Sequence, residues 1–180
     1  MGIVKPEMPC VLVCACCYRE ERDRDVALKA IEEQFGHFAD RSDRFPFTHT
    51  DYYFSEMGSP LYKLLVAFED LIPPGFLPDL KLMTNAIESA LASGESRTVN
   101  LDPGYLCASR FVLASTKDSP HRLYLGQGVY GELTLIYQNG AFTPLSWTYP
   151  DYREATAMDF LTRVRAWYLQ RLGTLLKVGA

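Results

Sequence analysis

Three pieces of sequence between residues 100 and 152 organise the rest of the chain. They read N-L-D-P-G-Y at residues 100–105, T-K-D-S-P-H-R-L-Y-L-G-Q-G-V-Y-G-E-L-T-L-I-Y at residues 116–137, and W-T-Y-P-D-Y at residues 147–152. The alternation of apolar and polar residues predicts strands here. Ionisable residues, tyrosines and turn-forming glycines are also denser in this stretch than elsewhere. The combination predicts a sheet that carries a polar, tyrosine-rich site.

The glycines at residues 126–128 predict a hairpin with a three-residue loop, in which Leu125 pairs with Val129. That register places two further pairs on one sheet face: Tyr124 with Tyr130, and Arg122 with Glu132. A two-residue loop would shift the register by one and separate the pairs. The face is either a structural ion pair beside a tyrosine ladder, or the floor of a site in which Arg122 binds an anion and Glu132 orients it or a metal.

The remaining elements are predicted from the periodicity of apolar residues and from the glycine and proline residues that end helices and strands. Residues 105–115 fit either helix or strand, and we lean towards a helix. Asn139-Gly140 predicts a second hairpin, and Asp102-Pro103-Gly104 predicts a turn. The other predicted elements are a strand at 11–18, a helix ending at Gly36, a strand at 62–71, a helix around 80–91, a strand at 97–101 and a closing helix at 158–176.

This order predicts an α+β fold. Strand, helix, strand, strand, helix, strand is the ferredoxin-like βαββαβ order. We therefore expect helices packed on one face of an antiparallel or mixed sheet, extended by a C-terminal β-meander and a closing helix. With 180 residues and no linker rich in Gly, Ser or charge, residues 1–180 are expected to form a single domain.

Composition narrows the function classes. Hydrophobic residues make up 48 % and charged residues 22 % of the chain, which is typical of a globular protein. The net charge of −4 argues against broad attraction to nucleic acids or anionic membranes, which need a cationic surface. No apolar run approaches the roughly 20 residues that span a bilayer. The start, M-G-I-V-K-P-E-M-P, does not resemble a signal peptide.

Five cysteines, four of them at residues 10–17, form an odd count in a chain without a signal sequence. We interpret them as reduced thiols in the cytoplasm. Cys14, Cys16 and Cys17 lie within V-L-V-C-A-C-C-Y, where we expect them to be small buried apolar residues of a strand and not zinc or iron–sulfur ligands.

The polar stretch supplies the candidate site residues. A carboxylate or imidazole held on a rigid turn can act as an acid, a base or a ligand, which selects Asp102, His121 and Glu132 as candidate catalytic residues. Cations suit a phosphate or carboxylate, and aromatic rings suit a base or a sugar. The candidate ligand-binding residues are Lys117, Arg122, Tyr105, Tyr124, Tyr130, Asp51, Tyr52 and Glu56.

The sequence contains no P-loop, G-x-G-x-x-G, H-E-x-x-H or G-x-S-x-G motif. The leading hypothesis is binding of a small anionic ligand, a nucleotide or phosphorylated metabolite, with or without a divalent metal. An enzyme of metal-assisted or acid–base phosphoryl chemistry is one version of it. The alternative is a protein-interaction module that uses its tyrosine and tryptophan loops, and single-stranded RNA binding ranks third.

The motifs N-L-D-P-G-Y-L, T-K-D-x-x-H-R-x-Y-L-G, Y-x-E-x-T-L-I-Y and W-T-Y-P-D-Y resemble the small bacterial and archaeal proteins grouped as domain of unknown function 4416. F-P-F at residues 45–47, T-D-Y-Y at 50–53, E-M-G at 56–58 and K-L-x-T-N at 81–85 extend the resemblance, which covers residues 11–165. The family has no established activity. The resemblance therefore highlights motif residues without implying a role for any of them.

Overall fold

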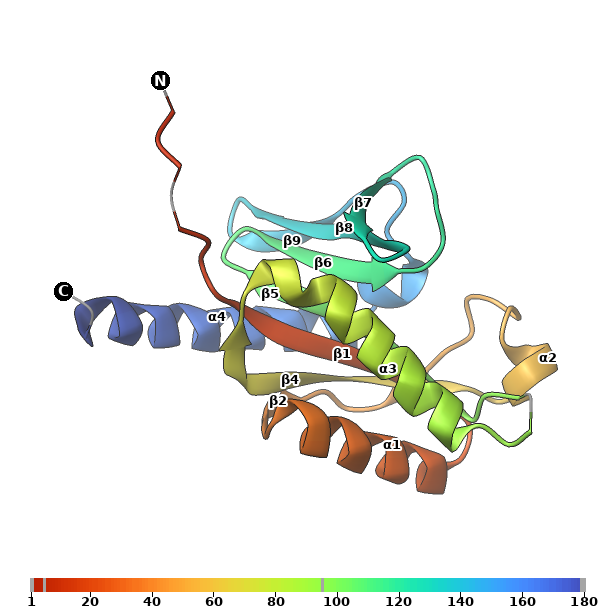
Figure 1. Cartoon of the computed structure of the whole chain (residues 1–180). Helices are drawn as coiled ribbons and strands as arrows, with labels where there is room; N and C mark the ends of the chain where they lie inside the picture. The colour runs from red at the N-terminus through yellow and green to blue at the C-terminus, as the bar shows by residue number, and fades with distance from the viewer. Residues whose placement is uncertain (1, 5, 95, 179–180) are drawn as a thin grey trace.

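The computed structural model describes residues 2–4, 6–94 and 96–178. Its elements, in chain order, are β1 (Cys10–Tyr18), α1 (Glu21–Phe35), β2 (Phe38–Arg41), β3 (Phe45–Pro46), α2 (Phe54–Met57), β4 (Tyr62–Ile72), η1 (Pro74–Phe76), α3 (Leu77–Leu91), β5 (Val99–Cys107), β6 (Arg110–Ser115), β7 (Arg122–Gly126), β8 (Val129–Gln138), β9 (Ala141–Pro144), η2 (Pro150–Arg153) and α4 (Ala155–Val178) (Figure 1). No helix in these ranges combines the length and apolarity needed to cross a membrane.

The strands form one antiparallel sheet in the order β2-β4-β1-β5-β6-β8-β7, with β3 beside β4 and β9 beside β8. This confirms the α+β class. All nine residues of β1 are buried, as its unbroken apolar run predicts for a strand covered on both faces. Because side chains alternate along a strand, β1 contributes to a separate core on each face of the sheet.

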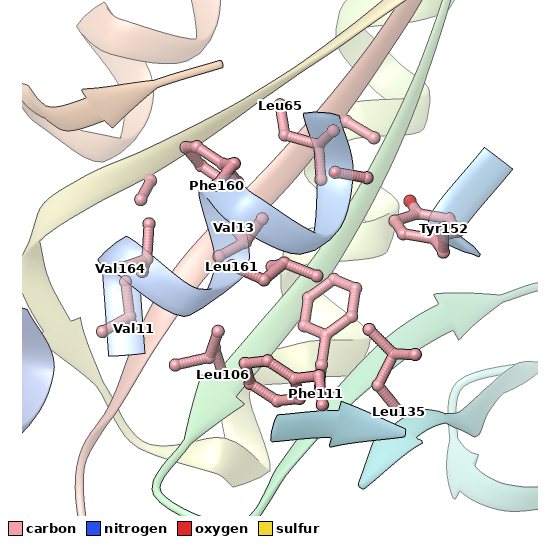
Figure 2. Close-up of a cluster of buried hydrophobic side chains, with 14 of the residues drawn as sticks. Val11, Val13, Leu65, Leu106, Phe111, Leu135, Tyr152, Phe160, Leu161 and Val164 are labelled. Carbon is pink, nitrogen blue, oxygen red and sulfur yellow. The ribbon is translucent and has the colours of Figure 1, made fainter. Parts of the chain in front are cut away.

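The expectation of helices on one face holds for two of the long helices. Helices α1 and α3 pack on the face that includes Leu12 and Cys14, whereas α4 covers the opposite face, with Val11 and Val13 (Figure 1). Figure 2 shows Phe160 of α4 in this second core, beside side chains from the strands. The closing helix lies on the opposite face because a fully apolar central strand needs cover on both sides.

The predicted helix at residues 105–115 is wrong, because this segment is the β5–β6 hairpin. Its apolar residues alternate with a period of two: Phe111 and Leu113 join the α4 core, and Val112 and Ala114 the opposite one. The turn in the middle of the hairpin interrupts the alternation of apolar and polar residues, and for this reason the segment also matched a helical spacing.

Asp102-Pro103-Gly104 was expected to form a turn, and this prediction is also wrong. The three residues continue β5, where they pair with Ala15, Cys14 and Val13 of β1. At Gly104 a Cβ atom would lie 2.5 Å from the carbonyl oxygen of Val112, so close approach of β6 requires glycine here.

At Gly104 the strands β5 and β6 begin to separate. The β5–β6 pairing runs between Gly104 and Cys107 on β5, with Gly104 opposite Leu113. Before Gly104, β5 stays paired with β1 as far as Val99, while β6 stays paired with β8 as far as Ser115. A wedge therefore opens between the first half of β5 and the end of β6.

The β7–β8 hairpin confirms two predicted pairs through a different loop. Arg122 lies opposite Glu132 and Tyr124 opposite Tyr130, but Gly126 and not Leu125 pairs with Val129. The loop has two residues, both with positive φ (55° and 75°), as tight hairpins prefer. The register shift between Tyr124 and Gly126 offsets the shorter loop, so the predicted pairs remain together.

Candidate functional site

A cavity of about 550 Å³ occupies the wedge between β5 and β6. Helix α3 forms one wall, the loop at residues 47–53 covers another, and the segment at residues 149–152 contributes a third. Side chains from β1, β4 and β8 complete the lining. The cavity therefore depends on Asp102-Pro103-Gly104, where the two strands separate.

Two buried lysine–aspartate pairs line this cavity. Lys63 Nζ lies 2.5 Å from Asp151 Oδ2, and Lys81 Nζ lies 3.3 Å from Asp102 Oδ1 and 2.9 Å from the carbonyl oxygen of Leu101. The lysine residues are 4 % and 6 % exposed. Such pairs are stable only when their mutual attraction offsets the cost of taking both charges out of water.

The pKa shifts of Lys63 and Asp102 both favour the charged form of the side chain. Burial by itself lowers the pKa of Lys63, but Asp151 and Asp102 raise it, and the net pKa lies above its ordinary value. Burial by itself raises the pKa of Asp102, but Lys81 and Lys63 lower it, and the net pKa lies below its ordinary value. At neutral pH Lys63 is therefore cationic and Asp102 is anionic.

Both lysines have donors to spare. An ammonium group has three N–H donors. Among the described residues, Lys63 uses one of them, on Asp151, and Lys81 uses two, on Leu101 and Asp102. The Lys63 ammonium also lies 4.8 Å from the centroid of the Tyr152 ring. The lining can therefore donate further hydrogen bonds from buried cations.

Two cavity residues carry buried oxygen atoms without a hydrogen-bond partner in the described part of the chain. They are Glu132, through Oε1, and Tyr152, through its hydroxyl. The residues are 1 % and 2 % exposed. Burial, followed by the charges of Asp102 and Asp151, raises the pKa of Tyr152 well above its ordinary value, so its hydroxyl keeps its proton. Buried polar atoms normally have partners, which makes this pair notable.

Every nitrogen of the Arg122 guanidinium is already engaged within the chain. Its Nε and Nη2 contact Glu132 Oε2 at 2.9 and 2.8 Å, and Nη2 also donates to the Tyr149 hydroxyl. Its Nη1 donates to the Ser115 hydroxyl and to the carbonyl oxygen of Lys117, both at 2.8 Å. Four of the five N–H groups of the guanidinium thus donate hydrogen bonds, and Nη2 is also in ion-pair contact with Glu132. The expected direct contact between Arg122 and an anion does not fit this geometry, and Arg122 instead positions Glu132 and Tyr149.

Of the other residues selected from sequence, His121 reaches the cavity indirectly. Its Nε2 lies 3.1 Å from Glu132 Oε2, and its ring stacks on Trp147 with centroids 5.4 Å apart. Lys117 and Tyr52 line the cavity, with the ammonium 3.7 Å from the centroid of the ring. Hydrogen bonding to Lys117 lowers the pKa of Tyr52.

The remaining candidates lie outside the lining. Glu56 forms a two-point ion pair with Arg97, at 2.8 and 2.7 Å, and thereby orients a cation that does line the cavity. Four more selected residues are not lining residues: Asp51, Tyr105, Tyr124 and Tyr130. Tyr124 and Tyr130 form the expected ladder, with ring centroids 5.4 Å apart.

Sequence reasoning selected Asp102 and Glu132 but missed Lys63, Lys81 and Asp151 at the centre of the site. Lys63 interrupts the apolar pattern of β4, and Lys81 follows Leu80 on the apolar face of α3. A charge at a position that should be buried was the signal that could have identified both. Asp151 and Tyr152 lay within the quoted W-T-Y-P-D-Y motif, but we treated it as an aromatic loop.

The described residues contain no preformed cluster of metal-ligating side chains. Among the described residues, no three or more His, Cys, Asp or Glu side chains are arranged to hold a metal ion. Cys14 and Cys17 have C-x-x-C spacing, but three residues along a strand place them on opposite faces of the sheet. All five thiols are free.

Comparison with known proteins gives one match. The family described as "Domain of unknown function (DUF4416)" matches residues 8–168, which include every lining residue named above. Neither the curated proteins nor the solved structures contain a match.

Proposed function

This chain belongs to the DUF4416 family, and from the geometry of its cavity we propose that it binds a small anionic ligand, a nucleotide or a phosphorylated metabolite, between β5 and β6. The observation that carries the proposal is the presence of two almost fully buried lysines, Lys63 and Lys81, with unused N–H donors at one cavity. Anionic oxygens are the strongest acceptors for such donors.

The size and charge of the cavity support this class of ligand. About 550 Å³ falls within the range of small-molecule sites, roughly 300–1,000 Å³. Lys117 is exposed, and no ion pair joins it to a carboxylate in the described part of the chain. A cation at the edge of a cavity attracts anions from solution.

If the bound ligand reacts in this site, residues of the cavity lining would carry out the proton transfers. Asp102, Glu132 and Tyr152 line the cavity and are among the groups that could accept or donate a proton there. A divalent metal would arrive with the ligand, because ligand oxygens would have to complete its coordination beside Asp102 and Glu132. His121 would act through Glu132.

The proposal also includes a ferredoxin-like topology for the first half of the chain and a cytoplasmic location. The order β2-β4-β1-β5, with α1 and α3 on one face, supports a ferredoxin-like reading of the first half of the chain. Five free cysteines, four of them buried, support a reducing compartment such as the cytoplasm.

A thermal-shift screen of nucleotides, phosphosugars and inorganic phosphate, each with and without Mg²⁺, tests the proposal. A ligand at a hundred times its Kd stabilises by about 2.7 kcal/mol, which raises Tm by roughly 5–10 °C for a chain of this size. Lys81→Met should abolish the shift. Lys29→Met is the matched control, since Lys29 is exposed on α1 and its replacement removes the same charge. The proposal fails if no anion in the screen stabilises the wild-type protein, or if both variants lose the shift equally.

One observation favours a second function, interaction with another protein. Leu123 and Tyr124, on the edge strand β7, are 75 % and 64 % exposed. Exposed apolar residues on a strand edge are typical of docking sites. The loop aromatics expected for this role are engaged internally instead, because Trp147 donates to the carbonyl oxygen of Leu133 and Tyr149 accepts from Arg122. A partner captured by the wild-type protein but not by Leu123→Ser would support this alternative.

A further inference from the structure

We infer that Glu132 accepts a hydrogen bond from a hydroxyl or amino group of the ligand, so that the site selects an anion that also carries such a donor. This inference rests on the proposed function and narrows its ligand class. It favours phosphorylated sugars, nucleotides and hydroxy acids over simple phosphates and carboxylates.

The two oxygens of Glu132 have different environments. Oε2 accepts a hydrogen bond from Nε of Arg122, and it lies 2.8 Å from Nη2 of Arg122 and 3.1 Å from His121 Nε2. Oε1 is buried and has no partner among the described residues. An ionised carboxylate can only accept hydrogen bonds, so whatever satisfies Oε1 has to be a donor. Leaving a buried charged acceptor unsatisfied is costly, which gives a ligand donor a large effect.

The carboxylate is also held in a fixed position. Glu132 lies directly opposite Arg122 across the β7–β8 ladder. Arg122 is in turn held by the Ser115 hydroxyl, the Lys117 carbonyl and the Tyr149 hydroxyl. A hydrogen-bonding group held this rigidly discriminates between ligands, because it cannot turn away from one that lacks the complementary donor.

Charge decides which end of the ligand reaches Glu132. A phosphate or carboxylate placed against this carboxylate would be repelled. The spare donors of Lys63 and Lys81 offer the anionic end a better position, on β4 and α3. The Tyr152 hydroxyl belongs to the same lining and is buried without a partner among the described residues. The site thus has a cationic part and an accepting part.

Matched pairs of anions test the inference. Glycerol 3-phosphate and propyl phosphate share a phosphate and a three-carbon chain, and differ in their hydroxyls. Lactate and propionate form the corresponding carboxylate pair. By calorimetric titration, the wild-type protein should bind the hydroxylated member of at least one pair about tenfold or more tightly. In Glu132→Gln this preference should shrink to about threefold or less.

Glu33→Gln is the matched control, since Glu33 is exposed on α1, and it should keep the wild-type preference. Circular dichroism and Tm show whether Glu132→Gln is folded, and the comparison in the wild-type protein stands even if it is not. Equal affinities within both pairs would overturn the inference and leave the proposed function intact. If no member of either pair binds, the inference is overturned, while the screen of nucleotides and phosphosugars decides the proposed function separately.

Discussion

Lys63 on β4 and Asp151 on η2 form a buried ion pair, with Nζ 2.5 Å from Oδ2, although 88 positions separate them in the chain. Their side chains are 6 % and 5 % exposed. The pair joins the central sheet to the segment that precedes α4, and it lines the cavity. It therefore links the stability of the fold to the chemistry of the site.

Removing one member of this pair should be far more damaging than removing both. Lys63→Met leaves Asp151 as an uncompensated buried charge, and we expect a loss of about 3–5 kcal/mol in the free energy of unfolding. The double variant Lys63→Met/Asp151→Leu should recover most of this loss. Urea denaturation measures all three proteins. Lys29→Met, on the surface of α1, should stay within about 0.5 kcal/mol of the wild type. A cost of less than about 1 kcal/mol for Lys63→Met would show that the pair is not a buried one in solution.

Asp102 should make stability depend on acid pH. Its pKa in the folded protein lies below its ordinary value because Lys81 and Lys63 outweigh the effect of burial. A carboxyl with a lowered pKa contributes stability above its unfolded pKa, about 3.9, and loses that contribution as the pH falls through the folded pKa. Urea denaturation between about pH 6 and about pH 3 should therefore show a smaller loss of stability in Asp102→Asn than in the wild type.

The exposed Asp118→Asn serves as the control for this experiment and should follow the wild-type profile. Parallel profiles for the wild type and Asp102→Asn would show that the lysines do not hold Asp102 ionised.

Two glycine-to-alanine substitutions should have opposite effects. At Gly104 the new Cβ would lie 2.5 Å from the carbonyl oxygen of Val112, so β6 has to move, and we expect a loss of about 1–3 kcal/mol. At Gly173, inside α4, nothing lies within 4 Å of the new Cβ, and alanine should stabilise by about 0.5–1 kcal/mol through its higher helix propensity. Thermal or urea unfolding distinguishes them. Equal stability of Gly104→Ala and the wild type would contradict the close approach of β5 and β6.

The cysteines should differ in reactivity. Burial raises the pKa of Cys10 and Cys17 to about 12, and Cys14 and Cys16 are fully buried beside them. Cys107 is half-buried. Because the thiolate is the reactive form, iodoacetamide at about pH 8 should modify Cys107 in the native protein and the other four after denaturation. Mass spectrometry of the intact protein counts the added groups. Cys107→Ser should take up none, and alkylation of Cys17 in the native protein would contradict its burial.

Much of the sheet could be predicted because its signals are local. The apolar run of β1 indicates a strand covered on both faces, and alternation around Gln127 places Arg122 opposite Glu132. Asn139-Gly140 turns a hairpin as expected, with both residues at positive φ. In each case, the residues that decide the structure are within about ten positions of one another.

The site was harder to predict because its contacts are distant in sequence. Asp102-Pro103-Gly104 has the composition of a turn, and only pairing with β1 reveals it as a strand. Lys63 and Lys81 were not selected, since neither partner carboxylate is near them in the chain. Asp102, Arg122 and Glu132 were selected for their charge and do line the cavity, but the engagement of every Arg122 guanidinium nitrogen depends on loops folded around it.

The parting of β5 and β6 also has a mechanical consequence. The two halves of the sheet are joined along β5 between Gly104 and Cys107, while the wedge separates them beyond that point. A molecule seated in the wedge would contact the first half of β5 and the end of β6 at the same time, and would so add a connection between the halves to those that α3 and α4 make. We therefore expect occupancy of the cavity to stabilise the two halves of the sheet together, from the strands under α1 to the β7 edge.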